Sequence, residues 1–187
     1  VDDQGAWSWV ADAPFKSPDR VIHNLVDNVS KNGYLLLNVG PKPDGTIPEP
    51  ARELLLAVGR WLETNGEAVF ETTPWLVYGE GPTHMADSGP FSERREVSYT
   101  ARDVRYTCRD SVLYATCLGW PGQEITFAAC GRELYEGEIT KVSLLGHEQP
   151  LRWRLSPEGL SVEVPPRRPC EHAFVFRIDR RRPFGLE

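Results

Sequence analysis

The chain has 187 residues, of which 40% are hydrophobic and 26% charged, so a soluble globular protein of one large or two small domains is expected. Its formal net charge of −6 argues against nucleic acid or an acidic membrane as the partner, because both attract basic surfaces. The apolar runs are too short to span a bilayer, and the acidic start of the chain does not resemble a signal peptide. Without an initiator Met, the chain is read as a mature or excised product, and its compartment stays unknown.

The first predicted element is a helix that begins after Ser17. Ser17 is a suitable N-cap, Pro18 suits the first helical position, and apolar residues recur with helical spacing over 21–29. The stretch 31–33 is expected to end the helix, with Gly33 in the left-handed terminal conformation.

A buried strand and a second helix are predicted next. Segment 34–39 is short and almost continuously apolar, which is typical of a strand covered on both faces in a parallel sheet. A turn-rich loop over 40–45 leads to a helix over 48–65, so this part resembles a piece of an α/β architecture. A single strand is not a sheet. Segment 34–39 therefore needs strand neighbours that this part of the sequence does not supply.

The pattern changes after residue 78. A Gly- and Pro-rich stretch over 79–90 indicates a linker or long loop, and short β-rich segments separated by turns follow it. Their spacing predicts an antiparallel β-sandwich. The predicted strands are 97–101, 104–108, 111–118, 124–128, 139–144, 151–155, 160–164 and 173–178. The predicted domains are therefore 1–78 and 79–187.

Cysteines and basic clusters indicate no metal or cofactor site. Cys108, Cys117, Cys130 and Cys170 form no CxxC pair and have no nearby His at a zinc-site spacing, so no metal and no cofactor are predicted. Free buried thiols are favoured over a Cys108–Cys117 disulfide. The arginines at 167–168 and 180–182 are interpreted as solvated faces.

Several long stretches resemble one enzyme family. They are 25–41 (LVDNVSKNGYLLLNVGP), 43–48 (PDGTIP), 61–70 (WLETNGEAVF) and 73–75 (TPW), with 114–115, 118–121 (LGWP) and 142–146 (VSLLG) in the second half. Together they resemble the carboxyl-terminal part of α-L-fucosidases of glycoside hydrolase family 29. The resemblance implies the end of a (β/α)8-like barrel, with 34–39 as its last strand and 51–64 as its closing helix, followed by a β-sandwich. It also implies hydrolysis of terminal α-linked L-fucose with retention of configuration, and hence a fucosylated glycan as substrate.

Catalytic carboxylates are not assigned to this chain. A retaining glycosidase needs two carboxyl groups about 5 Å apart. The resemblance puts the nucleophile, the acid/base and the fucose-binding histidines before the matched region, so the isolated chain is expected to be weak or inactive. Asp44 is a weak substitute candidate, because it follows the predicted strand at the active end of such barrels, but a turn role before Gly45 is favoured. Capping, ion pairs or other structural roles are expected for Asp27, Glu67 and Glu71.

Two tryptophans are the candidate substrate contacts. Segment 5–9 resembles the loop where family members place an aromatic ring against the methyl group and apolar face of fucose, so Trp7 is predicted to touch substrate, with Trp9 second. An ordinary buried Trp is the alternative. Packing is favoured over sugar binding for Trp120. The scattered histidines His23, His84, His147 and His172 are interpreted as surface or satisfied core residues.

Three functions are compatible with the sequence. The favoured one is part of an α-L-fucosidase that works only with the remainder of the catalytic barrel or with other copies of the chain. The second is a carbohydrate-binding or interaction module without catalysis, and the third is a hydrolase in its own right. Apolar surface around the unpaired segment 34–39 also predicts self-association.

Overall fold

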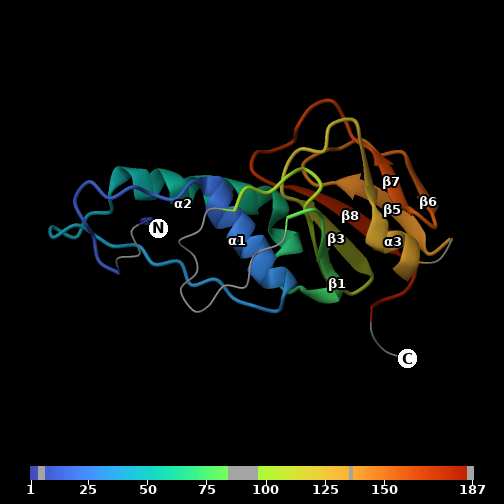
Figure 1. Ribbon diagram of the computed structural model, residues 1–187, viewed down its shortest axis with the longest axis horizontal. Helices are drawn as coiled ribbons and strands as arrows, with labels where there is room; N and C mark the ends of the chain where they lie inside the picture. The colour runs from blue at the N-terminus through green and yellow to red at the C-terminus, as the bar shows by residue number, and fades with distance from the viewer. Residues whose placement is uncertain (4–6, 84–96, 135–136, 185–187) are drawn as a thin grey trace.

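The computed structural model describes residues 1–3, 7–83, 97–134 and 137–184. Two antiparallel sheets, one of five strands ordered β1-β2-β3-β8-β5 and one of three ordered β4-β7-β6, lie beside two long helices (Figure 1). The elements in chain order are α1 (Pro18–Ser30), α2 (Glu49–Asn65), the 3₁₀ turn η1 (Gly66–Ala68), β1 (Thr73–Glu80), β2 (Val104–Arg109), β3 (Val112–Cys117), β4 (Glu124–Phe127), α3 (Ala128–Glu133), β5 (Ile139–Leu144), β6 (Trp153–Ser156), β7 (Gly159–Glu163) and β8 (Phe174–Arg180).

The two sheets enclose the first core. Tyr106, Phe127 and Phe176 are fully buried between them, and their rings meet edge to face with centroids 5.3–6.5 Å apart. β2 and β3 pair continuously, from Val104 opposite Cys117 to Arg109 opposite Val112. The predicted antiparallel β-sandwich is therefore confirmed.

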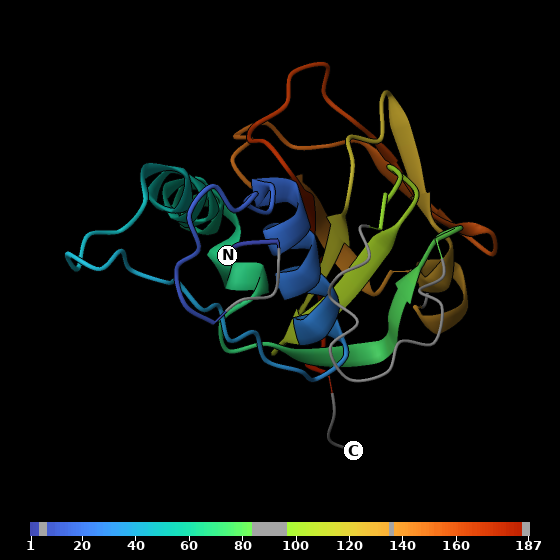
Figure 2. The same cartoon turned by 60° about the vertical axis from the view of Figure 1, so that its left-hand side comes forward.

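The helices α1 and α2 form a second core against the other face of the five-stranded sheet. Figure 2, in which α1 comes forward, shows the helical pair covering that face. Trp61 of α2 is 2% exposed, and its Nε1 donates to the carbonyl oxygen of Ala173 at 2.8 Å. Thr107 Oγ1 of β2 donates to the carbonyl oxygen of Ala68 at 2.8 Å. The five-stranded sheet is thus covered on both faces, and the chain has three layers.

The predicted start of α1 is confirmed, and its end differs in one detail. Ser17 Oγ accepts from Arg20 N at 3.2 Å, and Pro18 begins the helix. The left-handed residue after the helix is Asn32, with φ 63°, rather than Gly33. Asn tolerates this conformation because its short side chain bonds locally, so the Gly that follows was not needed for it.

Segment 34–39 is extended but has no strand partner among the described residues. Its side chains alternate: Leu35, Leu37 and Val39 pack partly against the second core, whereas Tyr34 is 97% and Leu36 87% exposed. The chain's own residues therefore cover one face only, which agrees with the expectation that segment 34–39 needs neighbours that this part of the sequence does not supply.

The sandwich strands follow the prediction with three corrections. Residues 97–101 are irregular and not a strand, whereas Thr73–Glu80 forms the edge strand β1 and Ala128–Glu133 forms the short helix α3. Residue 78, where the sequence changes character, falls inside β1, which pairs with β2. The predicted linker over 79–90 and His84 lie mostly or wholly outside the described residues.

The structure tests the predictions for the cysteines and for the basic clusters. All four cysteines are free thiols, and Cys108 and Cys117 stand at opposite ends of the β2–β3 pair, so the disulfide alternative is wrong. Arg180 is not on a solvated face: its side chain is 10% exposed, pairs with Glu138, and lies 3.6 Å from the ring centroid of Phe184. In the helices that the structure describes, none combines the length and apolar character that a membrane span requires.

Candidate functional site

The candidate site is the edge where segment 7–9 meets the end of segment 34–39. Asn38 Nδ2 donates to the carbonyl oxygen of Trp7 at 2.9 Å, and the backbone nitrogen of Val1 donates to the carbonyl oxygen of Asn38 at 2.6 Å. At position 40 a Cβ would lie 2.6 Å from Trp9 N, so only Gly40 permits this approach. The two tryptophans are thereby placed at the carboxyl end of the extended segment. In a (β/α)8 barrel that end is the catalytic face.

Trp7 and Trp9 differ in exposure at this edge. Trp7 is 74% exposed, whereas Trp9 is partly buried and its backbone passes close to Gly40. A largely exposed indole offers a flat apolar face to a ligand, and a buried one mainly supports the fold. The structure therefore brings both residues to one place, and substrate contact by either of them stays a prediction.

Asp44 forms a turn in the loop that follows this edge. Its carboxylate oxygen Oδ1 accepts from Thr46 N at 3.0 Å and from Thr46 Oγ1 at 2.7 Å. These hydrogen bonds, the backbone one first, lower the pKa of Asp44. A general acid needs a raised pKa at neutral pH, so the carboxyl group of Asp44 suits the turn and not proton donation.

The other acids considered from the sequence are held in ion pairs. Glu67 lies 3.3 Å from Arg177 Nη1, and Glu71 lies 3.7 Å from Arg109 Nη1. These pairs tie the exit of α2 to β8 and β2. Glu67, whose side chain is 32% exposed, has the structural role expected for it, whereas the Glu71 side chain is 86% exposed.

The helix-side histidines are also engaged by the fold. His23 Nε2 donates to the carbonyl oxygen of His172 at 3.2 Å, and the His172 ring lies 3.1 Å from Asp19. Burial lowers the pKa of His23, despite the raising effect of its hydrogen bond to the His172 carbonyl. Both residues therefore join α1 to the loop before β8, as satisfied structural histidines.

Trp120 packs within the sandwich. Its ring meets the ring of Phe174 edge to face with centroids 4.8 Å apart, and the guanidinium of Arg168 lies 5.9 Å from its centroid. Trp120 therefore packs, as expected, but its ring partner Phe174 belongs to β8 of the sandwich.

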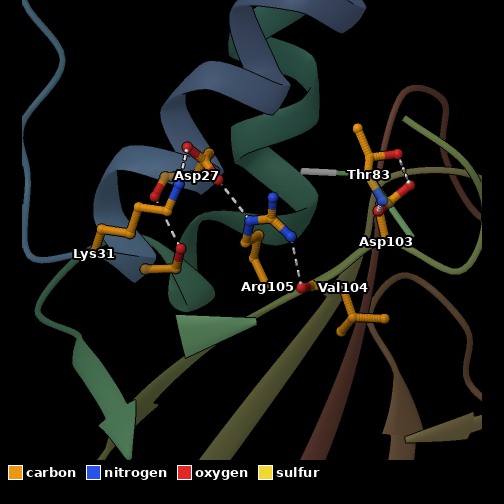
Figure 3. A network of polar contacts seen from close by, with 7 residues as sticks. Asp27, Lys31, Thr83, Asp103, Val104 and Arg105 are labelled. Atoms are coloured by element: carbon orange, nitrogen blue, oxygen red, sulfur yellow. Dashed lines mark hydrogen bonds and ion pairs between the residues drawn. The ribbon is translucent and has the colours of Figure 1, made fainter. Parts of the chain in front are cut away.

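A buried ion pair that the sequence analysis missed joins α1 to the sheet (Figure 3). Arg105 Nε of β2 donates to Asp27 Oδ1 of α1 at 2.6 Å, and the two residues are 4% and 6% exposed. Lys31 Nζ donates to Asp27 Oδ2 at 2.8 Å. The expectation of an ion pair for Asp27 is confirmed. The available signal for its partner was a charged residue inside the otherwise largely apolar run 104–108.

Asp103 forms a second polar cluster next to this pair, also drawn in Figure 3. Its carboxylate accepts from the backbone and hydroxyl groups of Thr83 and Thr100 at 2.6–2.9 Å. Burial acts to raise the pKa of Asp103, but these hydrogen bonds outweigh it and lower the pKa. The cluster holds together the described ends of the chain on either side of 84–96, and every contact in it is internal.

Sequence and structure comparisons agree with the resemblance. The sequence profile of the family described as "Alpha-L-fucosidase" matches residues 2–67, and that of the "Alpha-L-fucosidase C-terminal domain" matches residues 98–179. Together the two profiles cover most of the chain. The chain belongs to the α-L-fucosidase family.

Over the aligned residues, relatives of known name are about one third identical to this chain. Tissue alpha-L-fucosidase of Rattus norvegicus is 33% identical over 186 residues, which cover 95% of this chain and 36% of the relative. Plasma alpha-L-fucosidase of Homo sapiens is 32% identical over 186 residues, covering 94% of this chain and 36% of the relative. The crystal structure of Thermotoga maritima alpha-fucosidase in complex with fucose matches with a TM-score of 0.71 and 25% identity, covering 92% of this chain and 36% of that one. The chain thus spans just over a third of the length of these relatives.

Proposed function

We propose that this chain is the carboxyl-terminal part of a retaining α-L-fucosidase that cleaves terminal α-L-fucosyl linkages of glycans. In this proposal segment 34–39 is the last strand of the catalytic barrel, and α2 closes the ring. The remaining strands come from the rest of the barrel or, less simply, from other copies of the chain. The division into a barrel end and a sandwich falls near residue 78, with β1 as the shared connection.

One observation carries the proposal: segment 34–39 has no strand partner among the described residues and is half-exposed, although its sequence is that of a buried strand. Alternate side chains face the helices, as Leu35 and Leu37 do, or point away, as Tyr34 and Leu36 do. A strand added along this segment would pair with its backbone, and a closed barrel would cover Tyr34 and Leu36.

The isolated chain is expected to lack α-L-fucosidase activity. The carboxylates considered as substitutes are held in a turn, as Asp44 is, or in ion pairs, as Asp27, Glu67 and Glu71 are. The contribution proposed for this chain is therefore binding and shape. The exposed ring of Trp7 would lie against the apolar side of the fucose ring, with Trp9 as the second candidate contact.

A chimeric enzyme tests the proposal directly. The matching carboxyl-terminal third of the rat tissue enzyme would be replaced by this chain, and hydrolysis of a chromogenic α-L-fucoside would be measured for the chimera and for the chain alone. We expect turnover by the chimera and none by the chain. A folded chimera without turnover, or turnover by the purified chain that survives removal of host enzymes, would contradict the proposal. Glycan binding by the isolated chain without turnover would favour the binding module instead.

Two matched variants of the chimera locate the sugar contact. Trp7→Ala removes a 74%-exposed indole at the candidate site, whereas Trp153→Ala removes a 36%-exposed indole on β6, in the three-stranded sheet. We expect Trp7→Ala to lower kcat/KM by about tenfold, the effect of losing one aromatic contact, and Trp153→Ala to leave it unchanged. Equal effects would remove Trp7 from the site.

A further inference from the structure

The buried pair of Arg105 and Asp27 connects the two family regions of the chain, and its surroundings are built for a charge. The guanidinium also donates from Nη1 to the carbonyl oxygen of Val104 at 3.0 Å. The rings of Tyr78 and Tyr99 have their centroids 5.9 and 5.4 Å from its central carbon. Cations are attracted to aromatic faces, so the arginine is held from three directions.

The backbone beside Arg105 is shaped to admit it. A Cβ at position 79 would lie 2.9 Å from Arg105 Cδ and 2.6 Å from the Val104 carbonyl oxygen, so Gly79 of β1 leaves the room that the arginine fills. A buried pair of this kind often adds little net stability, because both charges lose their water. Its better-attested use is to select one arrangement of the packed elements, and here the elements are α1 and the sheet.

Contacts of α1 continue from this pair to the candidate site. Arg20 of α1 pairs with Asp3, and Lys16 N donates to the carbonyl oxygen of Val1 at 3.0 Å. Val1 in turn bonds Asn38, whose side chain bonds the carbonyl oxygen of Trp7. The position of α1 therefore sets where both segments of the site edge lie.

We propose that Arg105 and Asp27 are positioning residues, through which the sandwich fixes the place of α1 and, with it, the edge that carries Trp7 and Asn38. The sandwich is then a working part of the barrel site and not an appended sugar-binding module. The link to catalysis rests on the proposed function. The placement of α1 does not, and it can be tested on the chain alone.

His23 provides a spectroscopic readout of where α1 lies. Its ring stands at 83° to the ring of Tyr99 with centroids 5.4 Å apart, and it faces Asp19 and His172 as well as the positive charge of Arg105. Burial in this contact is the main cause of its lowered pKa. If α1 leaves its place, the ring gains water and its pKa rises towards 6.5.

The decisive variant is Asp27→Asn, followed by NMR titration of His23 and by hydrogen exchange of α1. Without the carboxylate, the ion pair that joins Arg105 to α1 is lost. We therefore expect the pKa of His23 to rise and amide hydrogen exchange in α1 to quicken by roughly tenfold or more. If α1 stayed in place, the uncompensated charge of Arg105 would keep that pKa low, and such a result would overturn the proposal.

Two further variants separate positioning from general destabilisation. Arg180→Met breaks the buried pair with Glu138 inside the sandwich, and we expect it to leave the pKa of His23 unchanged even if the chain is less stable. A rise equal to that in Asp27→Asn would overturn the proposal. Should Asp27→Asn fail to fold, Arg105→Lys keeps the charge but loses the planar fork. We then expect a smaller increase of exchange in α1, and exchange identical to the original chain would again contradict the inference.

Discussion

The contact between the helices and the sheet is buried, whereas the adjoining segment 34–39 is half-exposed. Towards the sheet, Ile22 and Trp61 are 0% and 2% exposed, and the buried polar groups are paired across the contact. Along the adjoining segment 34–39, Tyr34 and Leu36 are 97% and 87% exposed and the backbone has no strand partner among the described residues.

The difference shows which apolar surfaces are covered by other residues of the same chain. The sandwich presents Tyr114, Ala173 and Val175 to the helices, so that contact is complete within 187 residues. The extended segment has an apolar pattern made for two covered faces and receives cover on one. The match covers 36% of the length of the rat and human relatives, which fits this interpretation because most of the relatives' length lies outside it.

Breaking the helix–sheet contact should have the largest effect on stability. Trp61→Ala removes a fully packed indole and its hydrogen bond to Ala173, which is expected to lower the free energy of unfolding by about 3–5 kcal/mol. Urea denaturation followed by circular dichroism would measure it. Trp7→Ala, at an exposed indole, is the control and should change that energy by less than about 0.5 kcal/mol. Similar losses in both variants would mean that the two regions do not differ as described.

Acid should weaken the same contact through His23. Burial in the folded chain lowers the pKa of His23 below 6.5, so between the folded pKa and 6.5 the unfolded chain binds more protons. The stabilising contribution is therefore present above pH 6.5 and is lost as pH falls from 6.5 through the folded pKa. Measuring the free energy of unfolding at stepped pH values for the original chain and for His23→Gln isolates the contribution of His23. An identical pH dependence in the two proteins would show that His23 stays solvated.

Much of the fold was predictable because its patterns are local. Ser17 and Pro18 predict the start of α1, and short apolar runs between turns predict the sandwich. The errors have physical causes. β1 contains Pro74 and Gly79, which do not favour a strand, and it forms only because β2 offers an edge despite a register shift between them. Residues 97–101 have a strand-like composition, but their position is set by the turn around Asp103.

The candidate site was predictable only in part. Trp7 and Trp9 were found through a resemblance, and nothing in their own spacing shows that they meet Asn38 and Gly40. Arg105 was missed because its partner is 78 residues away, and pairs at that separation leave no periodic signal. Both the site edge and the Arg105–Asp27 pair depend on tertiary packing, which the local sequence pattern does not predict.

The smallest effect on stability is expected on the open side. The double variant Tyr34→Ser/Leu36→Ser alters only exposed side chains, so the free energy of unfolding should change by less than about 0.5 kcal/mol. Self-association should nevertheless fall, because these two residues are the most exposed large apolar groups of the described chain and lie on a segment without a strand partner in that part of the chain. Sedimentation at stepped concentrations would measure it, with Leu56→Ser on α2, 46% exposed, as the control. If the control reduced association as much, the association between copies would be nonspecific hydrophobic contact. Segment 34–39 would then not be the edge at which further strands are added.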